Sequence, residues 1–188
     1  AKPIEQPKPE VPQLPERKLE WGRFVALDNR PATISDQRPN TGDIVWRGGY
    51  ALIRTAGRDY VTPERGSASF VLKDGEATIT AANSTIGSVT SDLKNGLLSV
   101  DFGKASFVTS FDVVYGSQTY NMKADGMVFR GGQFGNSQSA QYTRPQANNM
   151  EVTGFLSNEN GGAAAYHFQG TMKDSSKVEG ITVWGASK

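Results

Sequence analysis

The sequence predicts an all-β protein, an antiparallel up-and-down β-barrel of about eight strands preceded by a Pro-rich extended tail. The 188 residues include 21 glycines, a content typical of many turns. Short apolar segments alternate with turn residues, and no apolar stripe at helical spacing extends over about ten residues. Because a sheet without covering helices has edges that invite association, we expect it to close into a barrel.

The first 18 residues are expected to be a spacer rather than part of the core. Residues 1–15 carry five of the nine prolines, interspersed with charged and amide side chains. Proline fixes φ and removes a backbone donor, so this stretch should be extended; a proline-rich ligand for another domain is the alternative. We therefore divide the chain into a spacer, 1–18, and a barrel domain, 19–188. We expect them to be the C-terminal part of a longer protein.

From residue 19 onward, short apolar segments can each be a strand or part of one. They cover residues 19–26, 50–56, 67–72, 76–82, 97–102, 105–115, 118–124, 126–134, 149–157, 163–172 and 180–185. Turns are expected at 103–104, 116–117 and 125–126. The segments therefore predict a meander of antiparallel strands.

The segment 105–115 shows the alternation of a strand most clearly. One of its faces consists of Phe107, Thr109, Phe111, Val113 and Tyr115. Just before it, residues 101–103 read Asp-Phe-Gly, but the glycine-rich loop, paired lysine and catalytic loop of a kinase cannot be assembled around them. We interpret this tripeptide as a strand end that enters a hairpin, with Phe102 in the core.

The predicted core is built on large aromatic residues of the strand segments. They are Trp21, Phe102, Phe107, Phe111, Phe168 and Trp184. We expect the segment around Trp21 to pair with the segment around Trp184, because joining the first and last strands removes both edges of a meander.

Charge and cysteine content exclude several function classes. The net charge of +1 provides no global field that would attract nucleic acid or an anionic membrane. The absence of cysteine excludes disulfides, thiolate metal sites and a cysteine nucleophile. No apolar run reaches the roughly 18 residues of a transmembrane helix. We expect no nucleic-acid partner, no transmembrane segment and no cofactor.

The spacing of aromatic residues and glycines resembles a known barrel family. Trp21-Gly22-Arg23 opens the domain and GITVWG, residues 180–185, closes it. Between them come GSASFVL (66–72), LLSVDFGKASFVTSF (97–111), ADGMVF (124–129), and VTGFLS and GGAAAYHF (within 152–168). This order resembles the C-terminal β-barrel of Gram-negative envelope proteins that carry a FecR-type domain upstream. That barrel is similar to those of transferrin-binding protein B and related surface lipoproteins.

The resemblance implies an envelope location, in the periplasm or at the outer-membrane-associated cell surface, and a role in binding or signalling. This chain has no FecR-type domain of its own, which argues against sigma-factor regulation by this part of the protein.

Candidate catalytic and metal-binding residues are few. His167 is the only histidine and shares a strand face with Ala165 and Gln169, so we expect a solvent-facing or hydrogen-bonded side chain. Haem ligation or general-base chemistry is the alternative for His167. The tyrosines that could also ligate haem iron are Tyr120, Tyr142 and Tyr166. Carboxylates are spread over turns, and none is marked as one of a catalytic pair.

Arginines and aromatic residues gather between positions 46 and 65, which suggests an exposed rim that binds a partner. Its candidate members are Arg47, Tyr50, Arg54, Arg58, Tyr60 and Arg65. Two polar, glycine-rich segments, 28–49 and 131–149, are expected to be long excursions at the ends of the barrel.

These observations predict a non-catalytic, envelope-associated β-barrel module for protein–protein interaction or signalling. The first alternative is a barrel that holds a small apolar ligand, haem or lipid, in its interior, although the large residues at 107, 111 and 115 favour a filled core. A hydrolase acting on glycans is the less favoured alternative.

Overall fold

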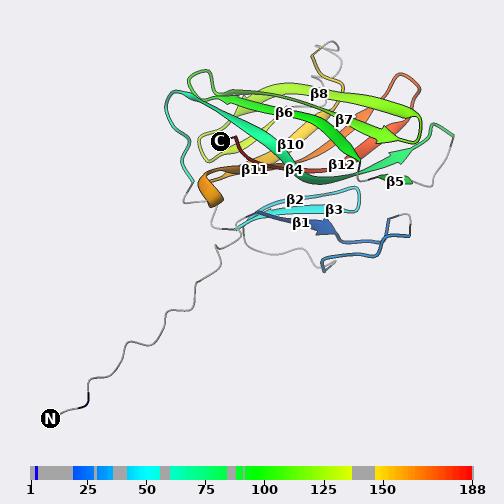
Figure 1. Ribbon diagram of the computed structural model, residues 1–188, viewed down its shortest axis with the longest axis horizontal. Helices are drawn as coiled ribbons and strands as arrows, with labels where there is room; N and C mark the ends of the chain where they lie inside the picture. The colour runs from blue at the N-terminus through cyan, green and yellow to red at the C-terminus, as the bar shows by residue number, and fades with distance from the viewer. Residues whose placement is uncertain are drawn as a thin grey trace.

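The computed structural model describes residues 3, 19–27, 29–35, 42–55, 60–83, 88–90, 92–136 and 147–187. They form a closed β-barrel with a small three-stranded sheet against one side (Figure 1). The described residues include one 3₁₀ turn, η2 (Glu159–Gly161). No helix among them is long and apolar enough to cross a membrane. The predicted spacer, 1–18, lies outside the described residues except for Pro3.

The barrel is an antiparallel meander in which each strand pairs with the next along the ring. Its strands are β4 (Ser67–Thr80), β5 (Ser88–Thr90), β6 (Leu93–Asp101), β7 (Ser106–Tyr115), β8 (Gln118–Val128), β9 (Gln133–Gly135), β10 (Glu151–Ser157), β11 (Ala163–Thr171) and β12 (Lys177–Ala186). The ring is closed because β12 pairs with β4, while β5 adds a short pairing at the far end of β4. The predicted closed barrel of eight strands is confirmed.

The strands that close the barrel differ from the predicted ones. β12 pairs with β4 from Lys177↔Thr80 to Ala186↔Phe70, and one register shift interrupts the pairing. The segment around Trp21 forms β1 (Leu19–Arg23), which pairs with β3 instead. The expected pairing of Trp21 with Trp184 is therefore wrong. A five-residue strand offers β12 far fewer ladder hydrogen bonds than the 14-residue β4 does.

The small sheet contains β1, β2 (Asp43–Arg47) and β3 (Tyr50–Arg54) in the order β1-β3-β2. β2 and β3 form a hairpin whose two turn glycines, Gly48 and Gly49, both have positive φ. The first strand of the barrel itself, β4, begins at Ser67. The division of the chain at residue 19 stays a prediction.

The interior of the barrel is filled with aromatic side chains in mutual contact. Phe107 meets Phe134 at a ring distance of 5.1 Å, and Phe111 meets Phe168 at 4.8 Å. Trp184 stacks on a tyrosine of β11 and is 1% exposed. Phe107, Phe111, Phe168 and Trp184 all lie in this core, because alternation along β7, β11 and β12 directs every second residue inward.

Two hydrogen bonds satisfy the polar atoms among these rings. The Tyr166 hydroxyl lies 2.6 Å from Thr109 Oγ1, and Trp184 Nε1 donates to Thr182 Oγ1 at 2.7 Å. Burial raises the pKa of Tyr166 far above its ordinary value. The inner face of the barrel is thus a packed core in which the phenol stays neutral.

Smaller departures from the prediction follow from local packing. Phe102 lies in the turn after β6 and is only partly buried against the core. The expected turn at Asp125–Gly126 lies inside β8, because Gly126 pairs with Phe107. A Cβ at Gly126 would come within 2.4 Å of the Gly135 carbonyl oxygen on the next strand. Glycine is there for close strand approach rather than for a turn.

Candidate functional site

The three-stranded sheet packs on the outside of the barrel, over β10, β11 and β12. We call the outward-facing residues of these strands, together with those of β4 from 74 to 80, the covered wall. An apolar cluster joins the two layers. It consists of Val45, Tyr50 and Leu52 from the sheet and Phe155, Ala165 and Ile181 from the wall. β11 is consequently buried on both faces.

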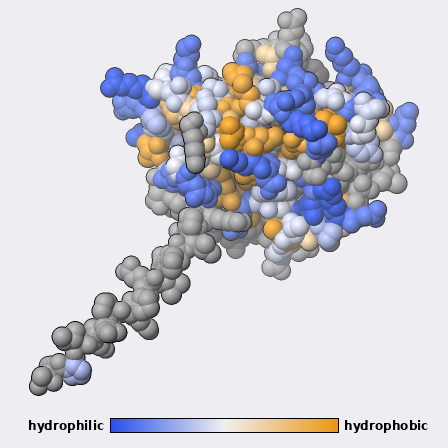
Figure 2. All heavy atoms as spheres, viewed as in Figure 1, coloured by the Kyte–Doolittle hydropathy of each residue, from blue (hydrophilic) through white to orange (hydrophobic). Residues whose placement is uncertain are grey.

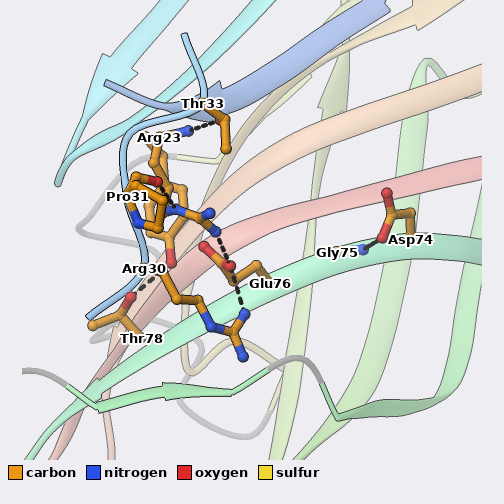
Figure 3. A network of polar contacts seen from close by, with 9 residues as sticks. Arg23, Arg30, Pro31, Thr33, Asp74, Gly75, Glu76 and Thr78 are labelled. Carbon is orange, nitrogen blue, oxygen red and sulfur yellow. Dashed lines mark hydrogen bonds and ion pairs between the residues drawn. The ribbon is translucent and has the colours of Figure 1, made fainter. Parts of the chain in front are cut away.

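A charged group lies at one edge of this interface (Figure 3). Glu76 projects outward from β4 and is 2% exposed. Arg23 and Arg30 both direct a guanidinium group at its Oε1, and the Arg30 contact measures 2.7 Å. Its second oxygen, Oε2, is buried and has no hydrogen-bond partner within the described part of the chain. The carboxylate therefore ties β1 and the segment after it to the barrel through one oxygen only.

Local backbone geometry holds Arg23 in place. Its Nε donates to the Pro31 carbonyl at 3.0 Å, and its backbone N–H donates to Thr33 Oγ1 at 2.9 Å. Backbone N–H groups of Thr33 and Ile34 both donate to the Arg23 carbonyl. Residues 31–35 thus fold back along β1, which fixes the direction in which Arg23 points.

Tyr50 adds a buried hydroxyl next to this charged group. Its oxygen lies 2.6 Å from Thr78 Oγ1. Burial raises the pKa of the Tyr50 phenol well above its ordinary value, and the negative charge of Glu76 raises it further. The phenol is therefore neutral and contributes a hydrogen bond rather than a charge.

His167 lies on the covered wall, on the outward face shared with Ala165 and Gln169, as the alternation predicted. It is only 1% exposed, so of the two expected arrangements, a solvent-facing or a hydrogen-bonded side chain, the solvent-facing one is wrong. Its Nε2 is 3.4 Å from Glu179 Oε2 but makes no hydrogen bond to any described residue. The covering sheet, which sequence patterns did not reveal, removes this imidazole from solvent.

The tyrosines considered as haem ligands do not converge with His167. Tyr166 points into the barrel, whereas the Tyr120 hydroxyl bonds to Asp174 at 2.9 Å near the surface. Tyr142 lies outside the described residues. Among those that are described, no group of three or more histidine or carboxylate side chains could hold a metal ion.

The predicted partner-binding rim is divided between interior and surface. Tyr50 and Arg54 are 0% and 1% exposed, Tyr60 is partly buried against the core, and Arg47 and Arg65 are exposed. Arg58 is outside the described residues. Tyr50 and Arg54 therefore cannot form an exposed rim; they attach the sheet to the barrel.

Arg54 shows how this attachment works. Its Nη2 donates to Asp43 Oδ2 at 2.7 Å, and its Nη1 donates to the Leu156 carbonyl of β10 at 2.8 Å. The guanidinium also lies over the Phe155 ring, 5.1 Å from the centroid. At the far end of the hairpin, Arg47 pairs with Glu151 at 3.3 Å.

The opposite part of the barrel has no such cover among the described residues. Exposed apolar side chains there form what we call the apolar strip: Val71, Leu97, Val108, Met127 and Phe129, each 40–59% exposed. They lie on or just after β4, β6, β7 and β8, which are neighbours in the barrel. Figure 2 shows apolar side chains exposed between hydrophilic ones on the barrel surface.

The outward positions between the residues of the strip are mostly serines. Register places Ser99 opposite Val108 and Ser106 opposite Met127. Ser110 lies opposite Leu97, whereas Asp125 lies opposite Val108 and Asp101 lies opposite Ser106. Serines and two aspartates therefore share this outer surface with the apolar side chains. The alternation of the sequence already indicates that these side chains face outward, because Leu97, Val108 and Met127 lie on the strand faces opposite to those of the core residues.

The two segments predicted as long excursions are more ordered than expected where they are described. The first, 28–49, contains β2, and the second, 131–149, contains β9. Asn148 and Asn149 accept hydrogen bonds from the backbone N–H groups of Asp125 and Lys123 on β8. These side chains satisfy β8 beyond the end of the short β9. Residues 36–41 and 137–146 lie outside the described part.

No family model matches the sequence, and no curated protein matches it. Among solved structures, the chain is similar to a double mutant and a single mutant of transferrin-binding protein B from Haemophilus parasuis Hp5. Both are 14% identical to it with a TM-score of 0.47, and each alignment covers 73% of this chain. It covers 28% and 29% of those two chains, so this chain spans less than a third of their length.

Proposed function

We propose that this chain is a non-catalytic β-barrel module of the bacterial envelope that binds another protein through the apolar strip. The observation that supports the proposal is the exposure of five large apolar side chains on neighbouring barrel strands. Contiguous exposed apolar surface on a soluble domain is typical of an interaction site. Serines and Asp125 lie between Leu97, Val108 and Met127, so the strip combines apolar side chains with polar ones, as surfaces that bind another protein do.

The filled interior argues against the alternative of a ligand-carrying barrel. A barrel of eight strands holds a small ligand only where inward side chains leave space. Here the inward positions carry phenylalanine, tyrosine and tryptophan rings in contact with one another. We therefore assign binding to the outer wall and not to the interior, and we propose no glycan hydrolase activity.

The test compares capture of envelope proteins by three versions of the chain. The strip variant carries Leu97→Thr and Val108→Thr, which place a residue of high strand propensity at each position while removing apolar surface. The matched control carries Val25→Thr and Val61→Thr, which change two exposed valines away from the strip. Each immobilised chain is incubated with detergent extract of a Gram-negative envelope, and bound proteins are identified by mass spectrometry.

We expect a protein that the unchanged chain and the control retain and that the strip variant loses at least tenfold. Equal retention by all three chains would refute the strip as the binding surface. No retained protein with any of them would refute the protein-binding function.

A further inference from the structure

The contacts between the three-stranded sheet and the barrel differ in kind from those within the barrel. Barrel strands are joined by backbone ladders, whereas the sheet is attached to the barrel through side chains. Arg54 donates to a β10 carbonyl, Tyr50 bonds Thr78, and the Leu19 N–H donates to Glu159 Oε1. The sheet can therefore separate without breaking a ladder hydrogen bond of either layer.

Two polar atoms on the covered wall make the closed arrangement less stable than its apolar contacts alone suggest. Glu76 Oε2 and His167 Nε2 are buried without a hydrogen-bond partner among the described residues. Both residues pair with Ile181 of β12, one from each side, so they lie in one row beneath the sheet. The Glu76 carboxylate is paired through Oε1 with Arg23 and Arg30, and His167 Nε2 lies 3.4 Å from Glu179 Oε2. Only the missing hydrogen bonds, which water would supply when the sheet lifts, therefore weaken the closed arrangement.

Residues 55–66 are the covalent link between β3 and β4, and we call its described end, residues 60–66, the hinge. Tyr60 packs against the core, whereas Val61 is 63% exposed. Gly66 has a φ of +93° with open space around the position of a Cβ, and its carbonyl accepts a hydrogen bond from the Phe102 N–H. Thr62 makes one backbone hydrogen bond, to the Arg130 carbonyl. Twelve residues can span roughly 40 Å when extended, enough to reach another molecule.

The surfaces exposed by opening are complementary and would not remain in water. The sheet presents Val45 and Leu52 with arginines around them, and the wall presents Phe155 and Ile181 with carboxylates around them. The surface that fits an open wall is the same sheet from a second copy, because it reproduces every contact of the closed chain. Such reciprocal exchange changes only the hinge.

We propose that the sheet exchanges between two copies of this chain, so that the β1–β3 sheet of one molecule covers the wall of the other. The exchanged dimer carries two apolar strips on one assembly. A bivalent molecule binds a clustered partner with higher avidity than either strip alone. This consequence rests on the proposed function, whereas the exchange does not.

The first experiment measures whether the sheet opens while the barrel stays folded. The chain contains no cysteine, so a single introduced thiol reports one position. Ala164 and Ala165 are neighbours on β11 and both 0% exposed, but Ala164 faces the interior and Ala165 faces the sheet. Reaction of Ala164→Cys and Ala165→Cys with a maleimide is followed in native buffer. We expect Ala165→Cys to react at least tenfold faster, and equal rates would overturn the proposal.

The second experiment detects exchange itself. β3 and β11 touch, so the double variant Leu52→Cys/Ala165→Cys is used to confirm that a short bis-maleimide links the two strands within one chain. Two differently tagged single variants, Leu52→Cys and Ala165→Cys, are then mixed at high concentration, diluted and treated with the same reagent. We expect a mixed dimer. Replacing Ala165→Cys by Ala164→Cys should abolish it, and Ser117→Cys on both chains, in the exposed turn between β7 and β8, gives the collisional background.

A mixed dimer no more abundant than that background would overturn exchange, even if Ala165→Cys reacts rapidly. Neither measurement depends on an envelope partner, so their failure and the failure of the strip to bind a protein are separate results. Ion pairs at the margin of the interface are screened by salt, so raising the ionic strength should increase the rate of exchange.

Discussion

Replacing the two tryptophans Trp184 and Trp21 with alanine, one at a time, tests where the stability of this protein resides. Trp184 is 1% exposed, stacks on Tyr166 at 5.9 Å and donates a hydrogen bond to Thr182. Trp21 is partly buried at the edge of the sheet–barrel interface. The structure therefore predicts very different costs for the same chemical change.

For Trp184→Ala we expect a loss of about 3–5 kcal/mol, the range for a large aromatic residue removed from a packed core. At roughly 2–4 °C per kcal/mol for a chain of this length, the midpoint of thermal unfolding should fall by about 6–20 °C. For Trp21→Ala we expect at most about 1–2 kcal/mol, since its ring keeps solvent contact.

Urea unfolding followed by far-UV circular dichroism is the appropriate assay, because it reports strand content and does not use tryptophan as the probe. Calorimetry on the same samples checks whether the barrel melts in one transition. Equal losses in the two variants, or a loss below about 1 kcal/mol for Trp184→Ala, would refute the assignment of Trp184 to the core.

Three further predictions follow from the same contacts. Glu76→Gln removes the charge that Arg23 and Arg30 share, so it should accelerate maleimide labelling at an Ala165→Cys position several-fold while the melting of the barrel stays the same; unchanged labelling would contradict the role of this carboxylate. The raised pKa values of Tyr50 and Tyr166 mean that the folded state holds these protons more tightly than the unfolded chain does above pH 10, so stability is fully present below pH 10 and falls as the pH rises beyond it. Alkaline denaturation should therefore be less steep in Tyr50→Phe. Addition of the protein to haem should leave the Soret band of free haem unchanged, and a saturable shift of that band would show that the packed interior opens to a ligand.

Alternation and turn spacing were sufficient to predict the barrel, because inward and outward positions differ sharply in β7, β11 and β12. Phe107, Phe111, Phe168 and Trp184 could be placed in the core for this reason. The pairing of β4 with β12, which closes the barrel, could not be predicted in the same way. The sequence of β4 contains two separate apolar segments, and Lys73-Asp74-Gly75 between them resembles a turn. In the structure these residues continue the strand through a register shift opposite Val183 and Trp184.

The covering sheet could not be predicted from the sequence, and its presence explains why several residues predicted to be exposed are buried. Tyr50, Arg54 and His167 were expected near solvent because period-two patterns show which residues share a face but not what lies over that face. The role of Glu76 could not be predicted for the same reason. A carboxylate on the outer face of a strand is expected to be in solvent, and only the structure shows that the covering layer brings Arg23 and Arg30 to it. The apolar strip was readable from sequence, as its members alternate with core residues, but exposure had to be established from the packing.

Closure of the ring between β4 and β12 also bears on how the protein acquires its structure. The strand that seals the barrel pairs with β4 from Lys177↔Thr80 to Ala186↔Phe70, so 96 to 115 residues (81–176 and 71–185) lie between the residues that must meet. Contacts between residues so far apart in the sequence make folding slow. The chain between β4 and β12 loses conformational entropy before the hydrogen bonds between these two strands compensate for the loss. Because β12 follows every other barrel strand along the chain, the growing polypeptide cannot close the ring until β12 has been synthesised.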